Sequence, residues 1–333
     1  MEWTTTPVSR VGRISSSLRS SKVQGQRLYQ RAICRYQRYV TSDTQGNYYL
    51  DQKDKIEGLV KAARVTRAKV QKLPYPLDGP SLANADNAKD AAEAAECASR
   101  VQYRQLIGML SYIMGHIRPD IAYALNVLSR YCNNPGRRHN EFLLCLVKYC
   151  KYSKDNRLKF HAHHGPYVAV TMRSITQAQF QCDADLASNL DNKHSSSANI
   201  GYLGHHNVVS FTSKTQGSLS TSTAESERKA VDHCFKEEAL VMRGMLIMMG
   251  LPQDATIIEE DNQACVYACL TRGMMHLNLA EMLIKEKVES KEIKLLKVAS
   301  ADNTSDIGTK RLALPLFNEL SSSIMDTLLR VNL

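Results

Sequence analysis

The chain has 333 residues and a formal net charge of +10, with 43% hydrophobic and 23% charged residues. That length suits two modest domains, and the composition is ordinary for a globular protein. No apolar run approaches the ~20 residues that a membrane-spanning helix needs, and the first residues lack the apolar core of a secretory signal. We therefore expect no membrane association and an intracellular location, cytoplasmic or alternatively nuclear. The excess of lysine and arginine favours a nucleic-acid partner.

The first third of the chain has little regular patterning. Residues 1–42 predict a basic, disordered arm, with a mitochondrial presequence as the alternative, because arginine and serine are frequent and acids nearly absent. Residues 43–100 are expected to hold a strand and a helix, followed by a linker rich in proline and small residues whose alanine-rich end favours a helix. Residues 101–155 predict helices broken at Pro119 and at the turn signal 133–136.

The pattern changes near residue 156, where strands begin to alternate with helices. A long helix is predicted from the capping run 220–223 to Gly250, and shorter helical segments are predicted at 262–271 and from 302 to 310. This arrangement is typical of a mixed α/β domain, which we place at 156–325. Strands are predicted at 157–161, 179–183, 198–203, 208–212, 256–260 and 292–298.

Four acidic residues fall at the ends of these predicted elements: Asp183, Glu227, Asp261 and Asp306. They are far apart in the sequence, so only a folded sheet could bring them to one edge. Carboxylates gathered there would raise one another's pKa values unless a cation intervened. Oxygen ligands suit Mg²⁺ or Mn²⁺, and two such ions ~4 Å apart form a clamp for phosphodiester hydrolysis. The alternative is that these acids are ordinary solvated surface residues.

The nine cysteines include no CxxC pair, which indicates reduced thiols. Cys265, Cys269 and His276 together could suggest a zinc site. No second ligand pair has suitable spacing, so we favour thiols packed on one face of a helix.

Several sequence blocks resemble, in the same order, the Pol polyprotein of copia-type retrotransposons. Residues 46–78 resemble the end of its reverse transcriptase. Residues 103–153, which begin YRQLIGMLSYIMGHIRPDI, resemble the segment that connects reverse transcriptase to ribonuclease H. The blocks that resemble its ribonuclease H domain are CDADLASNLDNKHSSS (182–197), SFTSKTQGSLSTSTAESE (210–227), EEDNQACVYA (259–268) and NTSDIGTKRLALPLFNEL (303–320).

The resemblance implies an RNase H-like α/β fold, a mixed five-stranded sheet with flanking helices, preceded by a mainly helical connection region. It implies that the four acids hold two Mg²⁺ ions, or Mn²⁺ in their place, against the RNA strand of an RNA–DNA hybrid. His276 matches a family histidine that would assist product release or proton transfer, with a surface or packing histidine as the alternative. The expected function is therefore an RNase H-like endonuclease within a retrotransposon polyprotein fragment.

The sequence also departs from the family pattern. No adjacent pair of aspartates occurs, so the polymerase motif Tyr-x-Asp-Asp is missing and polymerase activity is not expected. Leu186 replaces a tryptophan, and the block at 275–282 keeps only its first histidine. The helix after Glu227 is one residue longer than the pattern, which would turn everything beyond it by ~100°. These changes favour the alternatives: a non-catalytic remnant that at most binds nucleic acid, or an effector built from a captured fragment.

Overall fold

The computed structural model describes residues 40–67, 69–76, 81–161, 176–204, 207–271 and 279–327. The chain divides into two units between Thr41 and Ser42. Every element below lies in the second unit, except strand β1 (Val40–Ser42), which spans the division. The basic arm expected at 1–42 lies almost wholly outside the described residues. Within the described residues, no helix is both long and apolar enough to cross a membrane.

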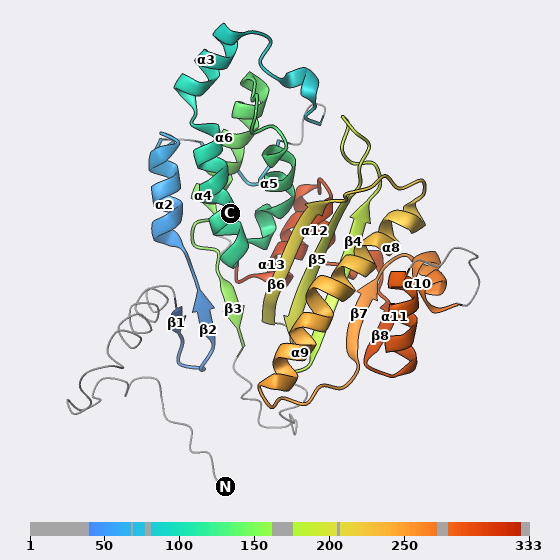
Figure 1. Cartoon of the computed structure of the whole chain (residues 1–333). Coiled ribbons are helices and arrows are strands. Elements are labelled where there is room, and N and C mark those ends of the chain that lie inside the picture. Colours follow the sequence, from blue (N-terminus) through green and yellow to red (C-terminus); the bar gives the residue numbers. More distant parts are fainter. Residues whose placement is uncertain are drawn as a thin grey trace, which may run out of the picture. The chain divides into compact units, whose positions relative to one another are not determined.

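A mixed sheet with the strand order β6-β5-β4-β7-β8 forms the centre of the second unit (Figure 1). The central strand β4 runs antiparallel to β5 and parallel to β7, while β6 is antiparallel to β5 and β8 is parallel to β7. This is the mixed five-stranded sheet that the family resemblance implies, and the expected α/β fold class with flanking helices is confirmed. The strands are β4 (Ala178–Asp185), β5 (Ser196–Leu203), β6 (Asn207–Thr215), β7 (Thr256–Glu260) and β8 (Ile293–Lys297).

Helices cover both faces of this sheet, and each face has its own hydrophobic core. Phe180 and Cys182 of β4 belong to one core, whereas Ile200 and Tyr202 of β5 belong to the other. Gln181 of β4 lies opposite Ile200, so these two side chains share one face of the sheet. Phe180 and Cys182 flank Gln181 and point to the other face, because side chains alternate along a strand. The first core includes α8 (Thr223–His233), α9 (Leu240–Met248), α10 (Gln263–Leu270) and α11 (Leu279–Glu289). Helix α11 is absent from the sequence prediction.

The second core joins the sheet to the helical region that precedes it. The break at Pro119 is confirmed, because α4 ends at Ile117 and α5 begins at Ala122. The break at 133–136 is confirmed as well, because α6 begins at Arg137. The helices outside the first core are α2 (Lys53–Ala62), α3 (Ala91–Arg100), α4 (Tyr103–Ile117), α5 (Ala122–Ser129), α6 (Arg137–Tyr152), α12 (Asp306–Thr309) and α13 (Leu314–Ile324).

The loop between α4 and α5 is fixed by a buried ion pair. Arg118 Nη2 lies 2.7 Å from Asp120 Oδ2, and both side chains are fully buried. The hydroxyl of Tyr149 on α6 donates a further hydrogen bond of 2.5 Å to Asp120. Nearby, the short strands β2 (Tyr48–Leu50) and β3 (Leu158–Phe160) pair antiparallel. These contacts hold residues from both ends of the helical region against one another.

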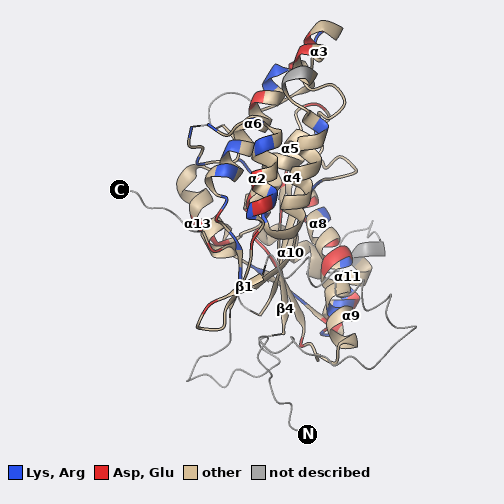
Figure 2. Cartoon of the chain, turned by 90° about the vertical axis from the view of Figure 1, so that its left-hand side faces the viewer, with Lys and Arg blue, Asp and Glu red and all other residues tan. Residues whose placement is uncertain are grey.

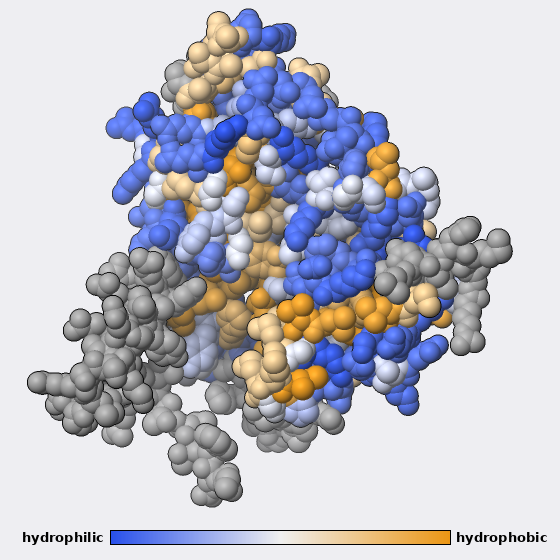
Figure 3. Space-filling model, viewed as in Figure 1, coloured by the Kyte–Doolittle hydropathy of each residue, from blue (hydrophilic) through white to orange (hydrophobic). Residues whose placement is uncertain are grey.

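The long helix expected after residue 223 is continuous but not uniformly α-helical. It runs as α8, then as the π-helical turn η4 (Cys234–Ala239), then as α9. A π turn holds one residue more than an α turn, so it absorbs a one-residue insertion locally. The ~100° rotation that the insertion would otherwise cause is therefore not required. The exposed side of α9 carries the apolar side chains of Val241, Met245 and Met248. Figure 3 shows hydrophobic surface in the region where Figure 1 places α9.

Candidate active site

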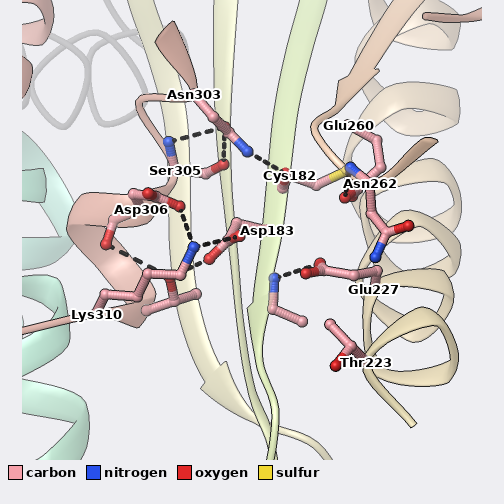
Figure 4. A network of polar contacts seen from close by, with 12 residues as sticks. Cys182, Asp183, Thr223, Glu227, Glu260, Asn262, Asn303, Ser305, Asp306 and Lys310 are labelled. Carbon is pink, nitrogen blue, oxygen red and sulfur yellow. Dashed lines mark hydrogen bonds and ion pairs between the residues drawn. The ribbon is translucent and has the colours of Figure 1, made fainter. Parts of the chain in front are cut away.

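Asp183 lies near the end of β4 and its side chain is fully buried. The hydroxyl of Thr309 donates a hydrogen bond to its Oδ2. The ammonium of Lys310 lies 3.0 Å from its Oδ1. Both carboxylate oxygens of Asp183 therefore contact the segment around α12, on the face of the sheet that carries the second core (Figure 4).

Glu227 reaches the same strand from the opposite face. It lies on α8, which begins after Ser222, whose hydroxyl accepts a hydrogen bond from the backbone of Glu225. Its Oε2 accepts a hydrogen bond of 2.7 Å from the backbone N–H of Ala184. Burial, with the nearby carboxylates of Glu260 and Asp183, raises the pKa of Glu227 to about 10. An acid in this position favours either a proton or a nearby cation.

Asp261 completes a cluster with these two acids. It directly follows β7, which runs parallel to β4 with Glu260 opposite Cys182. Because parallel strands end at the same edge of a sheet, Asp261 comes beside Asp183. One potential ligand atom from each of Asp183, Glu227 and Asp261 lies within 4.8 Å of the others. These three acids, predicted from well-separated blocks of sequence, are thus brought together.

Asp306 joins the site beside Asp183, and a lysine contacts both carboxylates. It is the first residue of α12, and its Oδ1 lies 2.7 Å from Nζ of Lys310. Burial and the proximity of Asp183 raise the pKa of Asp306 to about 7, even though Lys310 opposes this shift. Burial lowers the pKa of Lys310 itself, but Asp183 and Asp306 outweigh that effect and hold it above its ordinary value. The lysine therefore carries its positive charge.

His276, the fifth residue expected at the site, lies outside the described residues. Two residues that the sequence analysis overlooks contact the acids: Lys310 and Thr309. Lys310 follows Asp306 by four residues in the block NTSDIGTK, a spacing that lets side chains of opposite charge meet on a helical turn. That spacing is a signal that could have identified it.

The three-acid cluster suits a hard divalent cation. All its potential ligand atoms are carboxylate oxygens, the donors that Mg²⁺ and Mn²⁺ prefer. A positive ion there would also offset the repulsion that raises the pKa of Glu227. In contrast, Cys265 and Cys269 are buried in the first hydrophobic core, and no metal-binding group found among the described residues includes them. The zinc alternative therefore gains no support there.

Comparison with known proteins gives this fold and cluster a context. The chain is 28% identical over 279 residues to the retrovirus-related Pol polyprotein from transposon TNT 1-94 of Nicotiana tabacum, a match that covers 81% of this chain and 20% of that protein. It is also 28% identical to the polyprotein from transposon RE1 of Arabidopsis thaliana, over 67% of this chain and 15% of that one. Both of these similar proteins are transposon Pol polyproteins. This finding agrees with the resemblance to the copia type.

The chain spans at most about a fifth of these polyproteins, so their other parts have no counterpart in the match. No protein-family model matches the chain. Among solved structures, RNase H1 from Halobacterium salinarum matches with 13% identity and a TM-score of 0.25, over 39% of this chain and 90% of that one. A TM-score this low adds no weight to the fold assignment, which rests on the strand order and pairing.

Proposed function

We propose that this chain is an RNase H-like endonuclease that cleaves the RNA strand of RNA–DNA hybrids, within a fragment of a copia-type Pol polyprotein that lacks polymerase activity. The observation that carries this proposal is the convergence of Asp183, Glu227 and Asp261, with ligand atoms within 4.8 Å of one another. A divalent cation bound there would supply a water of lowered pKa and neutralise charge on the leaving oxygen.

The chain's own residues would hold and orient this centre. Thr309 fixes one oxygen of Asp183 and the backbone of Ala184 fixes one oxygen of Glu227, so two of the ligands are set before any ion binds. Ligands held by neighbouring hydrogen bonds keep the geometry of a metal site. Asp306 would complete a second ion's ligand set together with Asp183, and His276 would assist proton transfer or product release.

The nucleic-acid partner is supported by the net charge of +10. Basic proteins bind polyanions with an affinity that falls as salt rises, because binding releases counterions. Figure 2 shows basic and acidic residues interspersed on α2 and α11, so neither helix is uniformly basic. We expect the contact with a hybrid at the edge of the sheet that carries the acids, because the proposed ion would lie there. An RNA–DNA hybrid has an A-like helix, so it would present to this edge a different groove from that of duplex DNA, together with 2′-hydroxyls that DNA lacks.

A cleavage assay tests the proposal directly. With Mg²⁺ the full chain should cut the RNA of a labelled hybrid and leave single-stranded RNA largely intact. Asp183→Asn and Asp261→Asn should each abolish cutting, because each removes a negative ligand while nearly keeping the side-chain size. Asp254→Asn, an acid outside the cluster, is the control. A folded wild-type chain that cuts no hybrid would disprove the proposal.

A second candidate is a non-catalytic remnant that at most binds nucleic acid. The ion pair of Lys310 with Asp183 and Asp306 favours it, because an ammonium lies where the second ion of a two-ion centre would need those carboxylates. The two candidates share the fold and differ in magnesium-dependent cleavage. The same assay therefore separates them.

A further inference from the structure

Lys310 lies between two of the four acids (Figure 4). Its Nζ is 3.0 Å from Oδ1 of Asp183 and 2.7 Å from Oδ1 of Asp306. The lysine side chain is 35% exposed, whereas that of Asp183 is fully buried. One ammonium therefore binds both carboxylates from the solvent side. Asp183 therefore belongs both to the three-acid cluster and to a pair with Asp306 that already contains a cation.

The main chain around this lysine is fixed by the sheet. The amide of Asn303 donates a hydrogen bond of 2.9 Å to the carbonyl of Cys182. The hydroxyl of Ser213 donates another, of 2.7 Å, to the carbonyl of Gly308. A Cβ atom at Gly308 would lie 2.6 Å from Cβ of Ala198, so the segment packs against β5 more closely than a residue with a side chain would allow. The fold thus determines the position from which Lys310 reaches the acids.

We propose that Lys310 is the resident cation of the Asp183–Asp306 pair, so that the chain binds one divalent ion at Asp183, Glu227 and Asp261 and a second only when the ammonium leaves. This inference rests on the proposed function only in assuming that a divalent ion binds at the three-acid cluster. An ammonium and a divalent ion cannot occupy the same place between two carboxylates. Their like charges also repel strongly at such short separations.

The lysine is suited to leaving. Its ammonium is a compact charge on a flexible four-carbon stem, and its partial exposure lets that stem turn toward solvent without movement of the main chain. A phosphodiester arriving at the acids would give the ammonium another anionic partner. A second ion would then enter together with substrate. Lys310 would thus be a positioning residue that couples the second ion to the presence of nucleic acid.

Metal binding in the absence of nucleic acid tests this assignment. Mn²⁺ is titrated into the full chain by calorimetry. The wild type should bind one ion per chain, whereas Lys310→Met should bind two, with the second site strengthened at least about tenfold by loss of the competing charge. Lys310→Arg keeps the charge and should bind one. Lys236→Met is the matched control. Like Lys310, Lys236 forms an ion pair with the aspartate four residues before it, Asp232, at 2.8 Å, but this pair lies outside the three-acid cluster.

The outcomes separate this inference from the proposed function. Two ions of equal affinity in the wild type and in Lys310→Met, or one ion in both, would overturn the role of Lys310. No ion in any variant would overturn both proposals. A wild type that binds one ion, with a two-ion methionine variant, would support the role of Lys310 even if neither protein cuts a hybrid. Melting curves with Mn²⁺ establish that each variant is folded, and Lys310→Gln replaces the methionine variant if that one is not.

Discussion

The backbone N–H of Ala184 donates a hydrogen bond of 2.7 Å to Oε2 of Glu227 and so ties helix α8 to the central strand beside Asp183. This contact stabilises the ionised form of Glu227, but burial and neighbouring acids outweigh it. The site therefore holds carboxyl groups that cost stability when they ionise without a cation. The stability of the protein should consequently depend on both pH and metal.

The first prediction concerns that pH dependence. Burial is the principal cause that raises the pKa of Glu227 to about 10, of Glu260 to about 8 and of Asp306 to about 7. A carboxyl with a raised folded-state pKa keeps its proton while the unfolded chain has lost it, so its contribution is present at low pH and is lost as pH rises. In chelator, the melting temperature should fall as pH rises from about 5 through 8.

Saturating Mg²⁺ should reverse much of this loss, because an ion that binds only the folded state stabilises it by mass action. Glu227→Gln keeps an acceptor for the Ala184 N–H and removes the charge, so it should flatten the pH profile in chelator and reduce the response to Mg²⁺. Scanning calorimetry at several pH values measures both effects. A melting temperature that climbs over the same range in chelator would contradict the assignment.

The second prediction ranks the acids by their place in the cluster. Asp261→Asn removes one of three ligands that converge, so Mn²⁺ affinity should fall at least about 100-fold, since few other charged ligands remain. Asp306→Asn should weaken the binding of that first ion less than tenfold, because Asp306 contacts Lys310 and lies outside the cluster. Isothermal titration gives both values. Equal losses in the two variants would mean that Asp306 also holds the first ion.

The third prediction concerns the helical region that packs against the sheet. Asp120→Asn should destabilise the protein by roughly 3–5 kcal/mol, because it leaves the fully buried Arg118 without its counterion. Glu96→Gln breaks the exposed pair with Arg137, 2.6 Å apart, and should leave stability nearly unchanged. Denaturant unfolding followed by circular dichroism compares the two. A small effect of Asp120→Asn would show that the ion pair is not needed for this packing.

Sequence patterns predict the acids better than they predict what surrounds them. Asp183 and Asp261 are recognisable because Asp183 ends one predicted strand and Asp261 directly follows another, and parallel pairing brings such ends to one edge. The four-residue spacing of Asp306 and Lys310 indicates their own ion pair. The contact of Lys310 with Asp183 on β4 comes from the residue after a four-residue helix, and strand or helix periodicity carries no information on that contact. Helix α11 was missed because its residues, LAEMLIKEKVE, show only a weak separation of apolar and polar faces.

The extra residue that the family resemblance implies after Glu227 is the clearest case in which the sequence expectation and the structure differ. If the whole helix were rigidly α-helical, this extra residue would force either Glu227 or the apolar residues beyond it out of position. The structure avoids that choice, since the backbone widens into a π turn at Cys234–Ala239 while Glu227 bonds to Ala184 and Leu246 stays buried. A backbone that changes its hydrogen-bonding period locally cannot be anticipated from side-chain spacing alone.

The last prediction follows from this π turn. Deleting Glu237, an exposed residue within it, should convert the turn to α-helix and leave the flanking segments in their present orientation. The melting temperature should change by no more than about 4 °C, or ~1 kcal/mol for a domain of this size. Mn²⁺ affinity should be unchanged, because Glu227 lies before the turn and keeps its bond to Ala184.

The matched control is deletion of Lys229, which lies in the regular α-helical part of α8. No widened turn lies between the deletion and Cys234, so the residues that lead into the π turn should rotate by ~100° relative to Glu227. The buried residues Val231 and Phe235 would then leave the first hydrophobic core, and the protein should lose much of its stability. If the two deletions were equally damaging, the π turn would not be the site that accommodates the insertion. If the wild-type chain were inactive and deletion of Glu237 alone restored hybrid cleavage, the insertion would be what disabled the enzyme. Its effect would then act through something other than the position of Glu227.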